Sequence, residues 1–330
     1  MDFLFAAWLG TPVWFWLAFV VIVLALTAFD LGFLHKEDKA MGISESLKLS
    51  VFYIGIAMVF GVWVWLQKGP GPGMEYFTGY FIEKALSIDN VFVISMIFGF
   101  FAIAPKYQYR ALLWGILAVI VLRGLMIAGG AALVAQAYWV MYLFAAFLVF
   151  TGVKMLFTGD HDPDIGNNPV IRWISRHMRV TKQHHGEHFF VREADSTGKL
   201  VWAVTPLFLA LVVINLADLV FAVDSVPAIF SITTDTFIVY TSNIMAILGL
   251  RALYFALAAM VHRFHYLKYA LALVLVFIGA KIFVADFIMG GAKFPPLISL
   301  GVTLALIAGG VGWSLWKTRG EDKTTAPAAP

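Results

Sequence analysis

Long apolar segments constrain the fold of this chain more than any other feature. Of its 330 residues, 61% are hydrophobic and only 13% are charged, about half the charged share of an average soluble protein. A helix that crosses the hydrocarbon core of a bilayer needs about 20 apolar residues. The sequence therefore predicts an all-α polytopic membrane protein. Nine segments are long enough: 13–34, 46–66, 76–103, 109–134, 138–158, 200–231, 236–260, 266–288 and 294–316.

The basic residues predict how these segments are oriented. Outside the apolar segments, nearly all Lys and Arg fall in the loops of one side, including the long loop 159–199. The loops of the other side carry only Lys68 and Lys293. Because short basic loops stay in the cytoplasm, we expect a periplasmic N-terminus and a cytoplasmic C-terminus.

Composition also excludes two kinds of chemistry. The chain has no cysteine, which removes disulfides, thiolate metal ligands and thiol redox reactions. The net charge of +3 does not indicate a nucleic-acid partner, because the basic residues are spread over separate loops. The lipid bilayer is the partner that the composition predicts.

Two acidic motifs repeat inside apolar segments. Residues 83–93 read EKALSIDNVFV, and residues 218–228 read DLVFAVDSVPA. In each motif an acidic residue is followed six positions later by Asp and then by a small polar residue. Carboxylates inside a membrane are costly, so a duplicated set indicates a functional site. The two sets are Glu83, Asp89 and Asn90, and Asp218, Asp224 and Ser225.

The repeat extends beyond these motifs. Arg123 in LRGL matches Arg251 in LRAL, and Lys154 in LVFTGVK matches Lys281 in LVFIGAK. Each copy covers three predicted helices, an odd number, so the second copy enters the membrane from the opposite side. The sequence therefore predicts two inverted three-helix repeats that exchange between two arrangements, with the site near the midplane.

The repeats divide the chain into five parts. The loop between the repeats contains FFVREADSTGKLVWAV, whose alternation around a Thr-Gly turn predicts a β-hairpin. The parts are 1–75, with two N-terminal transmembrane helices; 76–158, the first repeat; 159–199, the cytoplasmic loop; 200–290, the second repeat; and 291–330, the last transmembrane helix and a disordered tail.

One interpretation of the buried charges is structural pairing. Arg123 and Arg251 would each form an interhelical salt bridge with an acid, which offsets the cost of burying either charge. Lys154 and Lys281 lie near helix ends, where a long side chain can reach the membrane surface. Asp30 would line a cytoplasmic vestibule or cap a helix, and the sequence favours neither role.

The other interpretation is metal binding. Asp89 and Asp224, with Asn90, Ser225 and carbonyls freed at a helix broken by Pro227, would form an oxygen-rich cage for Mg²⁺, Ca²⁺ or Mn²⁺. Glu83 and Asp218 lie on another helical face, since six residues turn a helix by about 240°. They would complete the cage or carry protons.

Several stretches resemble the TerC family of bacterial membrane proteins, and most closely its Alx branch. They are EKALSIDNVFV, the loop ending in HFFVRE, FDLGFLHK around Asp30, and the long run TPLFLALVVINLADLVFAVDSVPAIFSITTDTFIVYTSNIMAILGLRALYF. The resemblance runs from about Phe29 to Asp286 and beyond. One departure is Asn215-Leu-Ala ahead of Asp218, where Glu-x-Thr is expected.

The resemblance implies an architecture like that of the LysE-type exporters and a function in manganese export, with a historical link to tellurium resistance. Applied to this chain, it implies efflux of Mn²⁺ across the bacterial inner membrane, with the metal on the six motif residues and no prosthetic group. No GxxxxGK[ST] motif is present, so we expect exchange with protons rather than ATP hydrolysis or another enzymatic activity. Alx-like proteins also carry a redox label, which the cysteine-free sequence does not support.

Two other functions remain open at this level. The chain would act without transport, as a membrane partner in metal delivery or in envelope or tellurite stress resistance, with the 159–199 loop as its docking surface. Alternatively, Arg123 and Arg251 would bind an oxyanion, an interpretation that the neighbouring acids disfavour by repulsion.

Overall fold

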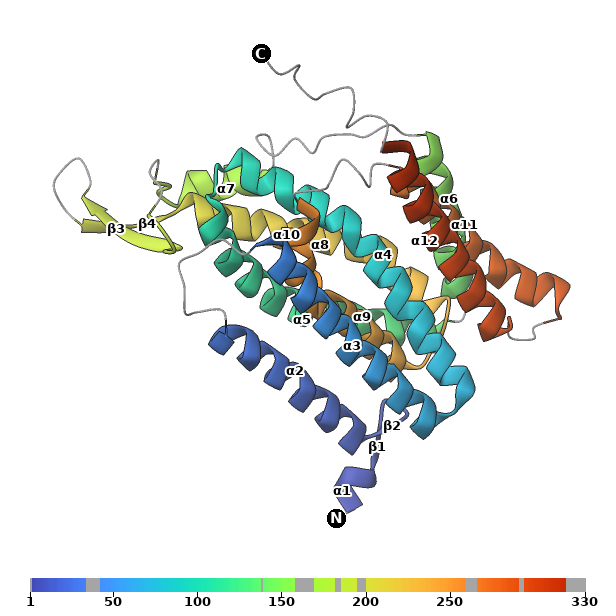
Figure 1. Cartoon of the computed structure of the whole chain (residues 1–330). Coiled ribbons are helices and arrows are strands. Elements are labelled where there is room, and N and C mark those ends of the chain that lie inside the picture. The colour runs from blue at the N-terminus through green and yellow to red at the C-terminus, as the bar shows by residue number, and fades with distance from the viewer. Residues whose placement is uncertain are drawn as a thin grey trace.

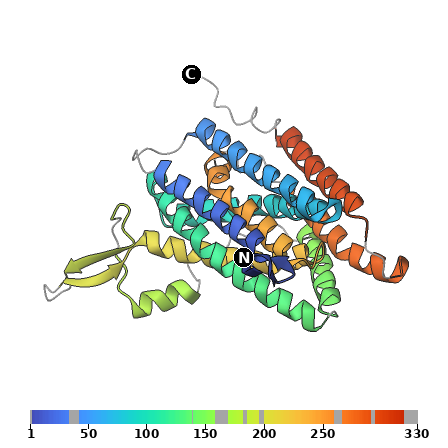
Figure 2. The ribbon, with the colours of Figure 1, turned by 90° about the horizontal axis from the view of Figure 1, so that it is seen from below.

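The computed structural model describes residues 2–33, 42–137, 139–157, 169–181, 185–194, 200–258, 266–290 and 294–318. Its long helices run side by side in one bundle, and a hairpin stands apart at one end (Figure 1, Figure 2). We call the end of the bundle that carries the hairpin the loop end, and the opposite end of the bundle the far end. The elements are α1 (Asp2–Phe5), β1 (Ala7–Trp8), β2 (Thr11–Pro12), α2 (Val13–Phe33), α3 (Ile43–Lys68), α4 (Pro70–Phe100), α5 (Pro105–Gln136), α6 (Val140–Phe157), α7 (Pro169–His177), β3 (Phe190–Ala194), β4 (Leu200–Val204), α8 (Pro206–Phe230), α9 (Thr236–Leu248), α10 (Leu250–Ala258), α11 (Leu267–Phe283), the π-helical turn η2 (Val284–Ile288) and α12 (Pro296–Thr318).

Seven of the described helices are long and apolar enough to cross a membrane: α2, α3, α5, α6, α8, α11 with η2, and α12. The pair α9 and α10 adds an eighth if it forms one bent span. The predicted count of nine is not confirmed. The difference is α4, which covers the predicted segment 76–103 with 31 residues but is interrupted by charged residues, Glu75, Glu83, Lys84 and Asp89.

Pro227 does not break the helix of the second motif, although the sequence predicts that it would. Helix α8 is not divided at Pro227, because the proline lies in its last turn and the helix ends at Phe230. The break comes one helix later, at Gly249, where α9 and α10 meet at an angle of 43°. The carbonyls freed by a broken helix therefore lie at the end of α9.

The two predicted repeats make matching contacts. Helix α4 packs against α9, α5 packs against α8, and α6 packs against α11. At the α6–α11 contact, a Cβ added to Gly152 would lie 2.6 Å from the carbonyl oxygen of Ala272, and one added to Gly279 would lie 2.6 Å from that of Ala145. Each helix thus uses a glycine to bring its backbone against the backbone of the other.

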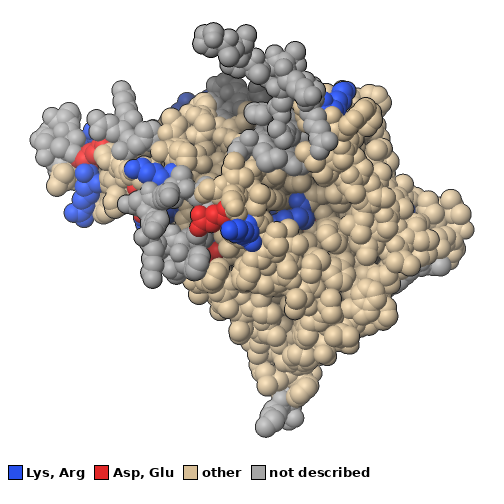
Figure 3. All heavy atoms as spheres, viewed as in Figure 1, with Lys and Arg blue, Asp and Glu red and all other residues tan. Residues whose placement is uncertain are grey.

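A small part of the described structure lies outside the bundle. Strands β3 and β4 pair antiparallel, with Phe190 opposite Val204 and Ala194 opposite Leu200, which confirms the predicted β-hairpin. The predicted disordered tail lies outside the described residues. On the face shown in Figure 3, the charged side chains that are coloured lie toward the top and left, and the described surface below them is uncharged, as expected of a surface that faces lipid.

Candidate functional site

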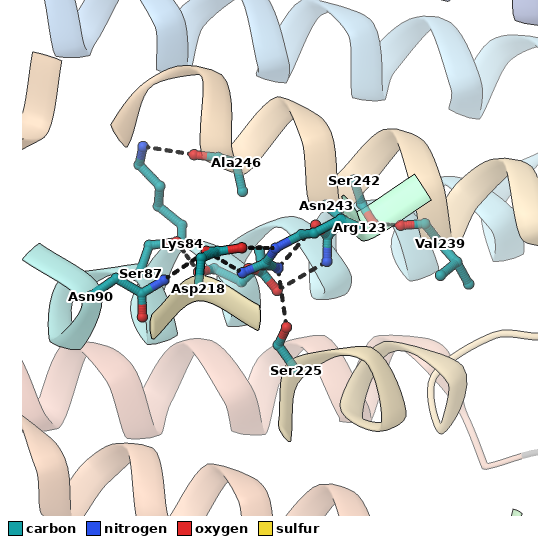
Figure 4. Close-up of polar contacts among 11 residues, drawn as sticks. Lys84, Ser87, Asn90, Arg123, Asp218, Ser225, Val239, Ser242, Asn243 and Ala246 are labelled. Atoms are coloured by element: carbon teal, nitrogen blue, oxygen red, sulfur yellow. Dashed lines mark hydrogen bonds and ion pairs between the residues drawn. The ribbon is translucent and has the colours of Figure 1, made fainter. Parts of the chain in front are cut away.

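A buried arginine lies at the centre of a polar cluster inside the bundle. Arg123 on α5 is 1% exposed and forms ion pairs with Glu83 on α4 and Asp218 on α8. Its Nε and Nη2 donate to the two carboxylate oxygens of Asp218 at 3.1 and 3.0 Å, a bidentate geometry that only arginine offers. Its Nη1 donates to Ser225 Oγ at 3.1 Å and to Asn243 Oδ1 at 3.0 Å. Figure 4 shows Asp218, Ser225 and Asn243 converging on the guanidinium.

Helical spacing explains how each motif contributes two residues to this cluster. Glu83 and Asn90 are seven positions apart on α4, as are Asp218 and Ser225 on α8, and seven residues make about two turns of a helix. Both members of each pair therefore face the same way. Across the two helices, Asn90 Nδ2 donates to Asp218 Oδ1 at 3.4 Å, so the motifs meet directly.

Asn243 on α9 completes the cluster, and sequence reasoning missed it. Its Oδ1 accepts from Arg123, and its Nδ2 donates to Glu83 Oε2 at 3.1 Å. The side chain is 0% exposed. The available signal was an amide within an otherwise apolar segment, which is costly to bury without hydrogen-bond partners.

The charges of the cluster do not cancel if both acids are ionised. Two carboxylates then face one guanidinium, and the neutral amide of Asn243 bridges the Arg123–Glu83 pair. Buried charges persist in proteins only when paired and hydrogen-bonded. In this structure the guanidinium of Arg123 is the counter-charge that both carboxylates share.

The equivalent arginine of the second repeat has a different partner. Arg251 on α10 pairs with Asp30 on α2, and its Nη1 donates to the hydroxyl of Tyr109 at 3.3 Å. That hydroxyl in turn donates to the backbone oxygen of Asp30 at 3.1 Å. A cavity of about 30 Å³ is lined by both Arg251 and Asp218, so the pair lies near the cluster. Asp30 is in the last turn of α2, which ends toward the loop end (Figure 1).

The remaining predicted residues whose side chains the structure describes lie apart from the cluster. Asp224 is half-buried on α8, and its charged neighbour is the exposed Lys154 of α6. Lys281 on α11 donates to Ser299. Asp89 lies within α4, but its side chain is outside the described ones. Among the described residues, no group of three or more His, Asp or Glu is placed to share a metal ion.

Lys84, next to Glu83 in the motif, turns away from the cluster. Its ammonium donates to the carbonyl of Ala246 at 3.2 Å, near the break at Gly249. Figure 4 shows this side chain directed away from Arg123. The lysine therefore binds the C-terminal end of α9, where the helix dipole favours a positive charge.

The long apolar helices and the ion-paired carboxylates at the centre of their bundle define a multi-pass membrane protein. Residues 68–322 match the family model described as "Integral membrane protein TerC family". This chain belongs to the TerC family.

Relatives of similar length support the assignment. An "Uncharacterized membrane protein" of Rickettsia bellii is 46% identical over 296 residues, which cover 90% of this chain and 95% of the relative. A Salmonella typhi protein named "Putative membrane-bound redox modulator Alx" is 41% identical over 323 residues, covering 95% and 97%. A protein of that name from Photorhabdus laumondii is 42% identical over 309 residues, covering 90% and 95%. No solved structure matches this chain.

Proposed function

We propose that this protein is a secondary transporter that exports Mn²⁺ from the cytoplasm across a bacterial inner membrane in exchange for protons. The observation that carries the proposal is the position of Arg123, whose guanidinium pairs with an acid from each motif, Glu83 and Asp218. A carrier that exchanges one cation for another needs such a site, because its carboxylates must stay neutralised when the transported ion has left. In this proposal, Arg123 does so between transport steps.

The atoms around Arg123 suit a hard divalent cation. Ser225 and Asn243 add a hydroxyl oxygen and an amide oxygen to the two carboxylates, and oxygen ligands of this kind bind Mg²⁺, Ca²⁺ and Mn²⁺. Asn90 now donates its amide nitrogen to Asp218 and also carries an amide oxygen. The choice of Mn²⁺ among them rests on the resemblance to the family.

Asp89 and Asp224 enter the proposal through rotation of their helices. Asp224 lies about 120° around α8 from Asp218, by the geometry of six residues, and Asp89 has the same relation to Glu83 on α4. In the metal-bound arrangement, turning these helices would bring the aspartates toward the ion while Arg123 withdraws. The acids that face the centre in this structure would then carry the exchanged protons.

Alternating access between inverted repeats would supply this motion. The reciprocal glycine contacts between α6 and α11, and the pairing of α4 with α9 and of α5 with α8, are the pattern that a two-fold axis in the membrane plane would produce. The Arg251–Asp30 pair would act as the gate toward the cytoplasm, closed in this arrangement.

A second candidate is a partner protein that does not transport. The hairpin and α7 expose Trp173, Leu200 and Trp202 at 59%, 64% and 63%, and exposed apolar side chains of this kind mark docking surfaces. An oxyanion carrier is less well supported, since the guanidinium of Arg123 is already bound by two carboxylates.

Flux into liposomes tests the proposal. Purified protein would be reconstituted around a dye quenched by Mn²⁺, with an acidic interior to drive Mn²⁺ inward in exchange for protons. We expect quenching by the wild type and none by Asp89→Asn or Asp224→Asn. Glu187→Gln, which changes a half-exposed acid paired with Arg110, is the matched control and should transport normally. Absence of flux from folded wild-type protein would favour the partner role.

A further inference from the structure

A second polar cavity lies at the far end of the bundle, separate from the Arg123 cluster. Its volume is about 150 Å³, and it lies among the ends of α4, α8, η2 and α12. Three charged side chains line it: Glu75 on α4, Lys281 on α11 and Asp286 on η2. Five hydroxyl side chains line it as well, from Thr78, Ser231, Thr233, Thr234 and Ser299.

The lysine of this cavity is buried, which makes its charge expensive. Lys281 is 6% exposed, its ammonium donates to Ser299 Oγ at 3.1 Å, and the Glu75 carboxylate is its charged neighbour. Asp286 accepts a hydrogen bond from the hydroxyl of Tyr142 at 2.6 Å. The charges are therefore held by specific partners around an open space.

We propose that this cavity is a second cation site, in which the Lys281 ammonium neutralises Glu75 and Asp286 until a divalent cation displaces it. The inference rests on the proposed export of a divalent cation and names the site that receives the ion before release. With both acids ionised, the three charged groups leave one negative charge in excess, so the cavity attracts cations.

The surrounding backbone favours a cation over an anion. Helix α8 ends at Phe230, with Ser231 as its cap, and the C-terminal end of a helix carries partial negative charge from its last carbonyls. A π-helical turn, a feature frequent at functional sites, carries Asp286. Carboxylate, hydroxyl and carbonyl oxygens together are the ligand set of a hard divalent ion.

The cavity is aligned with the central cluster through two shared helices. Glu75 precedes Glu83 by eight residues on α4, a rise of about 12 Å, and Ser231 follows Ser225 at the end of α8. Buried Ile82, Ile229 and Phe230 lie on the same stretches and would separate the two sites. A cation leaving the cluster along α4 and α8 would reach this cavity.

Among the described residues, the matching lysines of the two repeats differ in burial. Lys154, the counterpart of Lys281, is exposed on α6, whereas Lys281 is buried in the cavity. The buried Lys281 at the far end suits a role in release: by competing with the ion, it would lower the affinity of the protein for the ion where the ion leaves.

Titration of the purified full-length protein with Mn²⁺ tests the inference. Binding is measured from the electron paramagnetic resonance signal of free Mn²⁺. If Lys281 competes with the metal, Lys281→Gln removes a like charge and should tighten binding at one site about tenfold. Asp286→Asn removes a ligand and should abolish binding at that site. Lys317→Gln changes an exposed lysine at the other end of α12; it is the matched control and should leave binding unchanged. A purely structural Lys281 would give unchanged or weaker binding in Lys281→Gln, and that result would overturn the inference.

One further variant, together with the flux measurement, separates this inference from the proposed transport. Glu83→Gln alters the central cluster and should leave the site affected by Lys281→Gln intact. If Mn²⁺ binds there but wild-type protein gives no flux, the cavity is a cation site and the transporter proposal fails. If flux occurs and Lys281→Gln and Asp286→Asn do not change binding, the transporter proposal stands and the second site does not.

Discussion

Arg123 is the largest side chain that the described bundle buries almost completely, and it unites residues from four helices. The sequence placed Arg123 beside an acid but left two pairs of carboxylates to choose from. Each motif carries acids on two helical faces, about 120° apart, and local spacing does not say which face turns inward. Packing decides it, and Glu83 and Asp218 face the arginine.

Replacing this arginine should be very costly. Arg123→Gln leaves Glu83 and Asp218 buried without their counter-charge, and breaking a buried ion pair in this way costs about 3–5 kcal/mol. Thermal unfolding of the detergent-purified protein should show a large fall in midpoint. Arg110→Gln breaks a half-exposed pair with Glu187 and should cost about 0–1 kcal/mol. Equal effects of the two changes would show that the central pairs contribute little stability.

At the level of elements, the contact between α6 and α11 shows what sequence patterns reveal and what they leave out. The motifs LVFTGVK and LVFIGAK predicted that the two helices are equivalent copies. They did not predict that Gly152 and Gly279 lie against each other's helix backbone, because a contact between segments so far apart in the chain depends on the tertiary packing. Small residues at such positions let membrane helices approach closely.

A methyl group at either glycine should separate these helices. Gly279→Ala places a Cβ 2.6 Å from a carbonyl oxygen of α6, and overpacking of this kind costs about 1–3 kcal/mol. Gly129→Ala on α5 is the control, since its added Cβ meets nothing within 4 Å and alanine favours a helix over glycine. The unfolding midpoint should fall for the first change and stay level or rise for the second; a level midpoint for both would mean that the α6–α11 contact is loose.

At the scale of the whole molecule, apolar length and the hairpin alternation predicted most element positions. The number of spans was less predictable, because charged residues interrupt α4. Arg251 forms the predicted interhelical salt bridge with an acid, but the acid is Asp30 on α2, which lies outside the repeats and which the internal symmetry of the sequence does not indicate. Symmetry alone would have given the two arginines equivalent acids.

The predicted orientation has a direct test in the cysteine-free background. A single cysteine at exposed Phe5, at the far end, should react with a membrane-impermeant maleimide on intact cells. One at exposed Leu200, in the hairpin, should react only after permeabilisation, since the basic loops are expected to stay in the cytoplasm. The reverse labelling pattern would place the N-terminus in the cytoplasm and would contradict the predicted orientation of the proposed exporter.

The central claim is that a divalent cation is exchanged for protons, and that the acids now held by Arg123 carry those protons. Recording Mn²⁺ entry and internal pH in the same wild-type proteoliposomes tests it most directly. The account predicts that Mn²⁺ entering the vesicles is matched by protons leaving them, and that Glu83→Gln abolishes this coupled movement. Mn²⁺ entry without any change in internal pH, or coupled movement that persists in Glu83→Gln, would contradict it.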